Sequence, residues 1–265
     1  MIKAIAVDLD GTFLNPDSTY DKERFNKIYE QLVARDIKFL VASGSQYFRI
    51  KDFFPGKEQD ITIISENGAV VIQNKKVLEV FGFDDELVKK LVAYLNNDKE
   101  DLEVLLCGVK AAYLLADSSE KFKKFVAHHY FGHAEVKSFD PLPDDDIVKL
   151  AMDLKPEIVG KIVDQLNLDF PDELRAVSSG FEYVDVLLPN VNKGRAIKAL
   201  LTEWNIKPNE LLAFGDADND VEMLALTEHS YAMADSSDKA IRAAKHRARS
   251  NAESGVLTVI EQYLR

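Results

Sequence analysis

Ala4-Ile5-Ala6-Val7-Asp8-Leu9-Asp10-Gly11-Thr12 is the stretch of the chain that says most about its fold. An apolar run delivers two aspartates, two positions apart, into a glycine turn. Such a run is typical of a strand that is buried on both faces, as in a parallel sheet. This strand should end at the carboxyl edge of the sheet, where open α/β sheets bind ligands. Two carboxylates there repel each other and lose hydration, so a reaction or a cation explains them better than a turn.

Three later motifs place polar side chains at comparable junctions. Phe214-Gly215-Asp216-Ala217-Asp218-Asn219-Asp220 again sets several acids between a strand and a helix. Ala42-Ser43-Gly44 offers a hydroxyl at a strand end, and Asn192-Lys193-Gly194 offers an ammonium at a helix start. Taken singly, these motifs are also typical of helix caps and solvated surface. Together they supply acids for a metal, polar groups for phosphate and a carboxylate that can act as a nucleophile.

The first part of the chain alternates predicted strands with predicted helices, which favours right-handed crossovers and a parallel sheet. A hairpin around Asn74-Lys75 is expected to leave that sheet. The rhythm changes from about residue 84 to residue 187, where no dense cluster of catalytic residue types occurs, and the first rhythm returns after Pro189. The strands of the first part are expected at residues 2–8, 37–42 and 61–65, and its helices at 21–34 and 46–54.

Composition excludes several classes of protein. The 265 residues are 46% hydrophobic and 29% charged, which is typical of a soluble globular protein. A formal charge of −12 argues against nucleic-acid or membrane partners, but not against a phosphorylated substrate, because Mg²⁺ and a lysine can reverse the potential locally. The single Cys107 fits a reducing cytosol. Met1-Ile2-Lys3 leads directly into the first strand, so we expect no signal peptide and a cytoplasmic protein.

The four motifs, in this order, resemble those of the haloacid dehalogenase superfamily and, more narrowly, of the Cof-type phosphatases. The resemblance spans nearly the whole chain and includes Glu66-Asn67-Gly68-Ala69 and Ser179-Gly180-Phe181. Phe13-Leu14-Asn15 and other non-catalytic stretches look like a bacterial sugar phosphatase of that group. The resemblance implies an α/β fold with a Rossmann-like parallel-sheet core at residues 1–82 and 189–265. An α/β cap inserted at residues 83–188 would set substrate specificity.

The two aspartates of the first motif suit different steps of phosphate ester hydrolysis. Asp8, ionised near neutrality, suits covalent transfer of the phosphoryl group, and Asp10 suits protonation of the leaving oxygen. Asp10 must then hold a proton, which burial or the neighbouring carboxylate could arrange by raising its pKa. The resemblance assigns the same roles to these positions. The ion pumps of the superfamily have threonine at the second position, so Asp10 favours hydrolysis or mutase chemistry.

Asp216 and Asp220 are natural partners for Mg²⁺, which prefers oxygen ligands. The resemblance implies that the ligands are the Asp8 carboxylate, the Asp10 backbone carbonyl and the Asp216 carboxylate. It makes Asp220 a ligand through water or a support for Lys193. The residues expected to bind phosphate are Leu9, Ser43, Gly44, Lys193 and Asn219.

Substrate contacts beyond the phosphate are less specified. Many Cof-type members have arginine where this chain has Ser45, and a guanidinium would suit an additional anionic group. Ser45 and Gln46 instead present neutral hydrogen-bonding groups, which suit the hydroxyls of a sugar. Further candidates are Asn67, Gly180 and Phe181, with Phe181 either an apolar wall of the site or a core residue.

We therefore predict Mg²⁺-dependent hydrolysis of small sugar-phosphate monoesters through a phospho-aspartate at Asp8. The expected partner is a small phosphorylated metabolite, and the expected state is a monomer or a weak homodimer. Two alternatives stay open at this point. One is a phosphomutase on the same scaffold, and the other is a regulatory module that binds a phosphorylated ligand without turnover.

Overall fold

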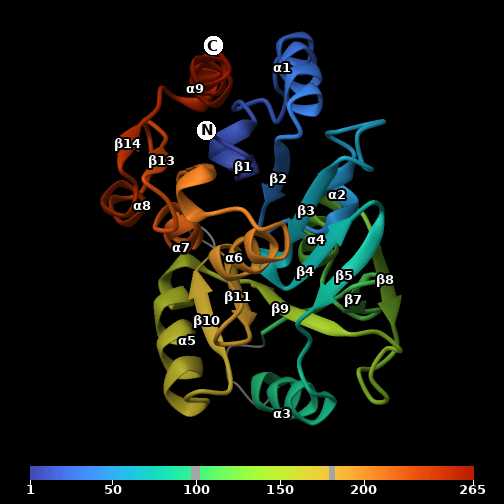
Figure 1. The fold of residues 1–265 in the computed structure, drawn as a ribbon. Coiled ribbons are helices and arrows are strands. Elements are labelled where there is room, and N and C mark those ends of the chain that lie inside the picture. The colour runs from blue at the N-terminus through green and yellow to red at the C-terminus, as the bar shows by residue number, and fades with distance from the viewer. Residues whose placement is uncertain (97–101, 179–182) are drawn as a thin grey trace. The chain divides into compact units, whose positions relative to one another are not determined.

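The structure is a computed structural model that describes residues 1–96, 102–178 and 183–265 (Figure 1). Contacts divide the chain into two compact units, Met1–Leu78 with Asn192–Arg265 and Glu79–Val191. These junctions lie a few residues from those expected at residues 82 and 189. Among the described residues, no helix combines the length and the apolar character that crossing a membrane requires.

An eight-stranded sheet forms the centre of the first unit, in the order β14-β13-β12-β1-β2-β3-β4-β5. The six strands from β14 to β3 run parallel, and β4 is antiparallel to β3. All four residues of β1 are buried, as its apolar run predicts. The strands are β1 (Ala4–Val7), β2 (Lys38–Ala42), β3 (Ile61–Ser65), β4 (Val70–Gln73), β5 (Lys76–Val80), β12 (Leu211–Gly215), β13 (His229–Ala232) and β14 (His246–Arg247).

The hairpin of β4 and β5 continues this sheet, so the prediction that it leaves the sheet was wrong. The chain reverses within one turn, Glu66–Gly68, where all three residues have positive φ. A Cβ at Gly68 would lie 2.4 Å from the Asn192 carbonyl oxygen, so only glycine fits there. Because the reversal takes so few residues, β4 is placed directly against β3, with Val70 opposite Ser65.

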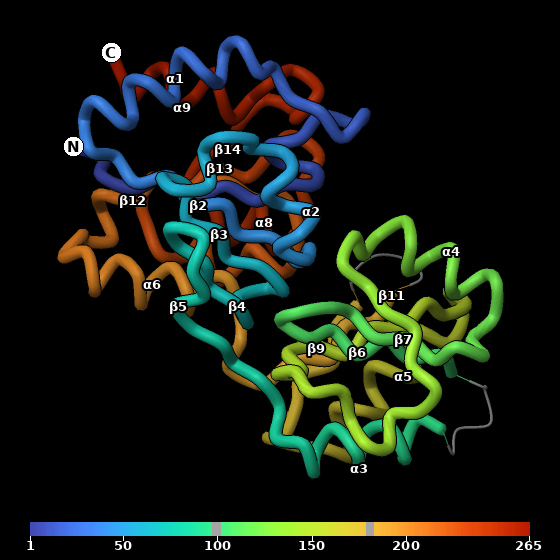
Figure 2. The backbone as a smooth tube through the Cα atoms, turned by 90° about the vertical axis from the view of Figure 1, so that its right-hand side faces the viewer, coloured from blue at the N-terminus to red at the C-terminus, as the bar shows by residue number. Residues whose placement is uncertain are grey.

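Helices cover both faces of the sheet. Figure 2 shows α1 (Lys22–Ala34) and α9 (Gly255–Tyr263) side by side, and the Phe25 ring of α1 packs 5.2 Å from the Phe39 ring of β2. On the opposite face, α6 (Lys193–Glu203) and α7 (Val221–Leu224) share a buried cluster with alternate residues of the central strands. Two shorter helices are α2 (Tyr47–Lys51) and α8 (Asp238–Ala243).

The order of the strands sets the place of the site. β1 lies between β2 and β12, so the chain leaves the centre of the sheet first on one side and later on the other. Ligands of open α/β sheets bind beyond the carboxyl ends of the strands at such a switch point. The segment Leu9–Phe13 follows β1 at this point as a turn in which the backbones of Asp10 and Gly11 are not helical. The first motif therefore lies where this topology favours a ligand.

The second unit is a six-stranded sheet in the order β10-β11-β9-β6-β7-β8 with helices on both faces. Alternate residues of β6 face opposite ways: Val104 and Leu106 join the cluster of α3 and α5, and Leu105 and Cys107 join the cluster of α4. Its strands are β6 (Val104–Gly108), β7 (Ala112–Leu115), β8 (His133–Val136), β9 (Ile147–Asp153), β10 (Arg175–Ser178) and β11 (Tyr183–Leu187). Its helices are α3 (Asp85–Asn96), α4 (Glu120–His129) and α5 (Pro156–Asp169).

Candidate active site

Three carboxylates of the first unit converge at the carboxyl edge of the parallel sheet. Asp8 follows β1, Asp216 follows β12, and Asp220 precedes α7. Each offers a carboxylate oxygen, and these oxygens lie within 4.8 Å of one another. Asp8 and Asp220 are buried and Asp216 is partly buried. The structure therefore brings together residues that lie more than two hundred positions apart in the sequence.

Lys193, the first residue of α6, joins two of these carboxylates. Its side chain is fully buried, and its Nζ donates to Asp8 Oδ1 at 2.6 Å and to Asp220 Oδ1 at 2.7 Å. Burial would lower the pKa of Lys193, but the two carboxylates outweigh burial and raise it, so the ammonium stays charged. Asp220 Oδ2 accepts from the backbone N–H groups of Asp216 and Ala217. Asp220 thus holds both the lysine and the loop.

The charge balance of this cluster is negative. Burial raises the pKa of Asp8 well above its usual value; Lys193 opposes this effect, and Asp220 and Asp216 add to it. Burial also raises the pKa of Asp216 to about 6, although a hydrogen bond from Thr12 opposes the shift. Three carboxylates around one ammonium leave an excess of negative charge, and their oxygens are the donors that Mg²⁺ prefers. The residues therefore fit a divalent cation.

The glycine and threonine of the first motif fit the chain around Asp216. Gly11 has a φ of 82°, and a Cβ there would lie 2.4 Å from Asp216 Oδ2. Thr12 is buried, and its Oγ1 donates to Asp216 Oδ1 at 2.6 Å. No role was expected for Thr12 from the sequence, although the residue belongs to the stretch that decides the fold. Its bond orients a carboxylate that faces the cation position.

The residues expected to hold phosphate lie at the same edge. Ser43 is buried at the end of β2, and its carbonyl accepts from the Asn67 N–H at 3.0 Å. Asn67 Oδ1 in turn accepts from Asn219 Nδ2 at 2.9 Å. A Cβ at Gly44 would lie 3.0 Å from Asn67 Oδ1, so the glycine allows close packing there. The third strand's turn, which carries Asn67, therefore joins the serine motif to the last acidic motif.

The other expected site residues have different surroundings. Leu9 and Gln46 are buried; Leu9 begins the turn after β1, and Gln46 lies just before α2. Gly180 and Phe181 lie outside the described residues.

Asp10 differs from its expected environment. Its side chain is 53% exposed, so burial, one of the two environments considered for it, is not the one observed. Both of its carboxylate oxygens accept hydrogen bonds from Arg49: Nη1 donates to Oδ2 at 2.7 Å and Nη2 donates to Oδ1 at 2.8 Å. The two hydrogen bonds from Arg49 thus form a bidentate pair, the strongest form of arginine–carboxylate contact. A cation, and not a second carboxylate, is the direct partner of Asp10.

Arg49, the cation of this pair, was not among the residues expected at the site. Arg49 lies on α2, four residues after Ser45, and its Nη1 also donates to Ser45 Oγ at 2.5 Å. A guanidinium therefore lies beside Ser45, a charged neighbour that the neutral side chains of Ser45 and Gln46 did not indicate. The spacing of four residues at a helix start was visible in the sequence and could have indicated this approach.

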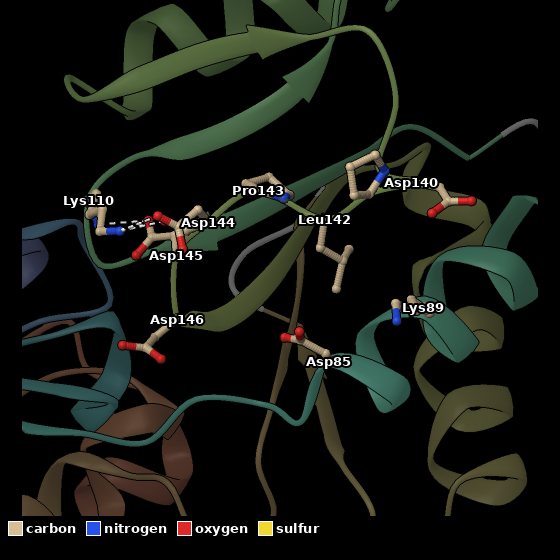
Figure 3. Close-up of a pocket in the computed structure, with 10 residues that line it drawn as sticks. Asp85, Lys89, Lys110, Asp140, Leu142, Pro143, Asp144, Asp145 and Asp146 are labelled. Atoms are coloured by element: carbon tan, nitrogen blue, oxygen red, sulfur yellow. Dashed lines mark hydrogen bonds and ion pairs between the residues drawn. The ribbon is translucent and has the colours of Figure 1, made fainter.

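The second unit contains a pocket (Figure 3). It has a volume of about 540 Å³, and its lining includes the acidic run Asp144, Asp145 and Asp146. Asp145 Oδ2 accepts from the backbone N–H of Lys110 at 2.8 Å, and Lys110 Nζ lies 3.5 Å from Asp144 Oδ2. Local partners therefore account for two of these acids. The pocket contains none of the expected site residues.

Comparison with known proteins shows that this chain is similar to phosphatases with an α/β fold. The chain is 35% identical to 5-amino-6-(5-phospho-D-ribitylamino)uracil phosphatase of Escherichia coli, over 100% of this chain and 97% of that protein. A Bacillus subtilis phosphatase with the same substrate in its name is 27% identical, over 99% of this chain and 98% of that protein. A solved structure from Streptococcus mutans matches with a TM-score of 0.93 and 37% identity, covering 100% of this chain and 99% of that one.

A family model described as haloacid dehalogenase-like hydrolase matches residues 5–260. The chain therefore belongs to the haloacid dehalogenase-like hydrolases and, within them, to the Cof-type phosphatases. This result confirms the resemblance read from the four motifs. The Rossmann-like core and the phosphatase class are confirmed with it.

Proposed function

We propose that this phosphatase hydrolyses small sugar-phosphate monoesters with the help of Mg²⁺ and forms a phospho-aspartate at Asp8. The observation that carries the proposal is the position of the Asp8 carboxylate. It is buried at the end of the central strand, paired with Lys193 at 2.6 Å, and within reach of two further carboxylates. A buried carboxylate beside a fixed ammonium and a candidate cation position suits nucleophilic attack on phosphorus.

In the first step, an Asp8 oxygen forms a bond to phosphorus while the ester P–O bond breaks. The electron pair of that bond stays on the leaving oxygen, and Asp10 supplies the proton that this oxygen takes up. In the second step, Asp10 accepts a proton from water, the water oxygen bonds to phosphorus, and the bond to Asp8 breaks. Lys193 is charged throughout and stabilises the ionised form of Asp8.

We assign the cation position to Mg²⁺, held by the carboxylates of Asp8 and Asp216 and the backbone carbonyl of Asp10. When bound, Mg²⁺ offsets the repulsion between an anionic ester and an anionic nucleophile. Asp220 supports this arrangement by holding Lys193, because both of its oxygens already accept hydrogen bonds. We assign the phosphate oxygens to Ser43, Asn219, Lys193 and the backbone of Leu9 and Gly44.

The choice of a sugar phosphate rests on two supports. The name of the E. coli relative gives that protein a substrate with a phosphorylated ribityl group, which is a sugar-alcohol chain. In this chain, Gln46 lies just before α2, three residues after Ser43, and Asn67 accepts a hydrogen bond from Asn219. Both amide side chains therefore belong to segments next to the residues that we assign to the phosphate. We further assign substrate choice to the second unit, because all four motifs lie outside it. Phe181→Ala should then change kcat/KM unequally among sugar phosphates.

Turnover with a generic ester tests the proposal. The protein with Mg²⁺ should hydrolyse p-nitrophenyl phosphate and sugar phosphates, and a single turnover should release inorganic phosphate. Asp17→Asn, a change in the exposed loop before α1, is the matched control for Asp8→Asn. Activity lost only in Asp8→Asn supports the proposal. Transfer of the phosphoryl group from Asp8 back to the sugar, instead of to water, would contradict hydrolysis and would indicate a phosphomutase.

A further inference from the structure

The guanidinium of Arg49 lies at the edge of the catalytic site with a carboxylate already bound. Its two terminal nitrogens donate to the two oxygens of Asp10 at 2.7 and 2.8 Å, in the parallel arrangement that fits carboxylates and phosphates alike. The carboxylate that these two nitrogens bind here is that of Asp10, a residue of the protein itself. A substrate anion of the same shape fits the same two donors.

The two partners of this pair differ in how firmly they are held. The Arg49 side chain is only 16% exposed; its Nη1 also donates to Ser45, and its guanidinium carbon lies 5.5 Å from the centre of the Phe53 ring. The Asp10 side chain is 53% exposed. Replacing Asp10 by another anion would therefore leave Arg49 in place and keep its bond to Ser45.

The proposed reaction requires Asp10 to move away from Arg49. Asp10 must bring an O–H group to the leaving oxygen, but both of its oxygens accept from the guanidinium. The resting pair therefore competes with the acid role. Separating it without a substitute would leave a mostly buried guanidinium without its carboxylate, which is costly. A second anion on the substrate removes this cost.

We propose that Arg49 selects phosphate monoesters that carry a second anionic group, a carboxylate or another phosphate, within reach of its guanidinium. This anion replaces Asp10 on the guanidinium, and the released Asp10 turns to the leaving oxygen. The inference rests on the proposed function and makes sugar-acid phosphates and sugar bisphosphates the preferred members of its substrate class. Arg49 is then the residue that couples substrate charge to proton delivery.

Two matched pairs of substrates test this selectivity. Glycerol 3-phosphate and 3-phosphoglycerate differ by a hydroxymethyl group against a carboxylate, and fructose 6-phosphate and fructose 1,6-bisphosphate differ by one phosphate. We expect kcat/KM to favour the anionic member of at least one pair by about tenfold or more, the usual effect of a charged hydrogen bond. The gain should appear mainly in kcat. The pair that shows it identifies the anion.

Variants separate the fork of Arg49 from its charge. Arg49→Gln should abolish the preference, and Arg49→Lys should retain part of it because lysine keeps the charge without the fork. Arg35→Gln, at the exposed end of α1, is the matched control and should keep the preference. If neither substrate pair shows a preference that depends on Arg49, the inference is wrong.

Binding gives a readout that needs no turnover. Calorimetry in the presence of a chelator should show tighter binding of 3-phosphoglycerate or fructose 1,6-bisphosphate than of its neutral partner, and Arg49→Gln should erase the difference. Asp10→Asn should strengthen binding of that anion several-fold, because the resident carboxylate is gone. Unchanged anion affinity in Asp10→Asn would contradict the exchange. Charge-selective binding without any turnover would contradict only the proposed function.

Discussion

Lys193 Nζ donates a hydrogen bond of 2.6 Å to Asp8 Oδ1 across 185 residues of sequence, and both side chains are buried. The contact ties the end of β1 to the start of α6. It also places a fixed positive charge beside the proposed nucleophile. The same ammonium holds Asp220, so one side chain compensates two buried carboxylates.

Lys193→Met should therefore harm both stability and activity. Removing one partner of a buried ion pair costs about 3–5 kcal/mol, because the remaining charges lose their compensation. Urea unfolding measures this free energy, and p-nitrophenyl phosphate measures activity. Lys198→Met, an exposed position of the same helix, is the control and should change neither quantity appreciably. Equal stability of the two variants would contradict the structural role of the pair.

Asp10→Asn should separate proton delivery from nucleophilic attack. Sugar phosphates leave as alkoxides and need the proton, whereas p-nitrophenolate scarcely does. We expect kcat/KM, which reports the first step and not the hydrolysis of the phospho-enzyme that both substrates share, to fall by about a hundredfold or more for sugar phosphates and much less for p-nitrophenyl phosphate. Steady-state kinetics with both kinds of substrate gives the comparison. Equal losses for both would count against Asp10 as the acid.

Chelation should silence the enzyme, and Mg²⁺ should restore it. Ca²⁺ should restore it poorly, because this ion prefers more ligands and longer bonds and would separate the reacting groups. Activity titrations with each ion after removal of the chelator provide the measurement. Full activity in excess chelator would overturn the assignment of a metal.

The affinity for Mg²⁺ should fall as the pH falls. The proposed site would bind Mg²⁺ through the ionised carboxylate of Asp216, whose pKa burial raises to about 6. Above this value the carboxylate is free to bind; below it a proton competes, and affinity should drop by up to about tenfold per pH unit. Calorimetry between about pH 7 and about pH 5 should also detect proton release on binding. Asp218→Asn, whose exposed carboxylate pairs with Lys239, should not alter the profile, and a flat profile in the unaltered protein would refute the prediction.

Local patterns predicted the parallel core well. The apolar run of β1 and the glycine and aspartate after it are neighbours in sequence, so their periodicity and turn chemistry were readable. The four motifs also indicated the family, because their residue types and their order can be read from the sequence alone. Each motif ends a strand or begins a helix. β14 has only two residues and β8 only four, so neither is long enough for a pattern that identifies a strand, although β8 exposes the alternate residues His133 and Glu135.

The features that the sequence did not predict are contacts between segments far apart in the chain. Asp10 and Arg49 meet across 39 residues, and no local pattern tells which way an exposed aspartate turns. Thr12 meets Asp216 across 204 residues, so its role depends on the order of the strands. The course of the hairpin after β3 depends on three residues with positive φ, of which Asn67 and Gly68 are types that favour this conformation and Glu66 is not.

Trapping the phospho-enzyme tests the central claim most directly. During turnover, hydroxylamine should attack the acyl phosphate at Asp8, release phosphate and leave a hydroxamate on that side chain, which peptide mass spectrometry can locate. The account predicts modification of residue 8 only when substrate and Mg²⁺ are present, and none in Asp8→Asn, whose kcat should fall by at least about 10³-fold. Modification at another carboxylate, or substantial turnover in Asp8→Asn, would contradict it.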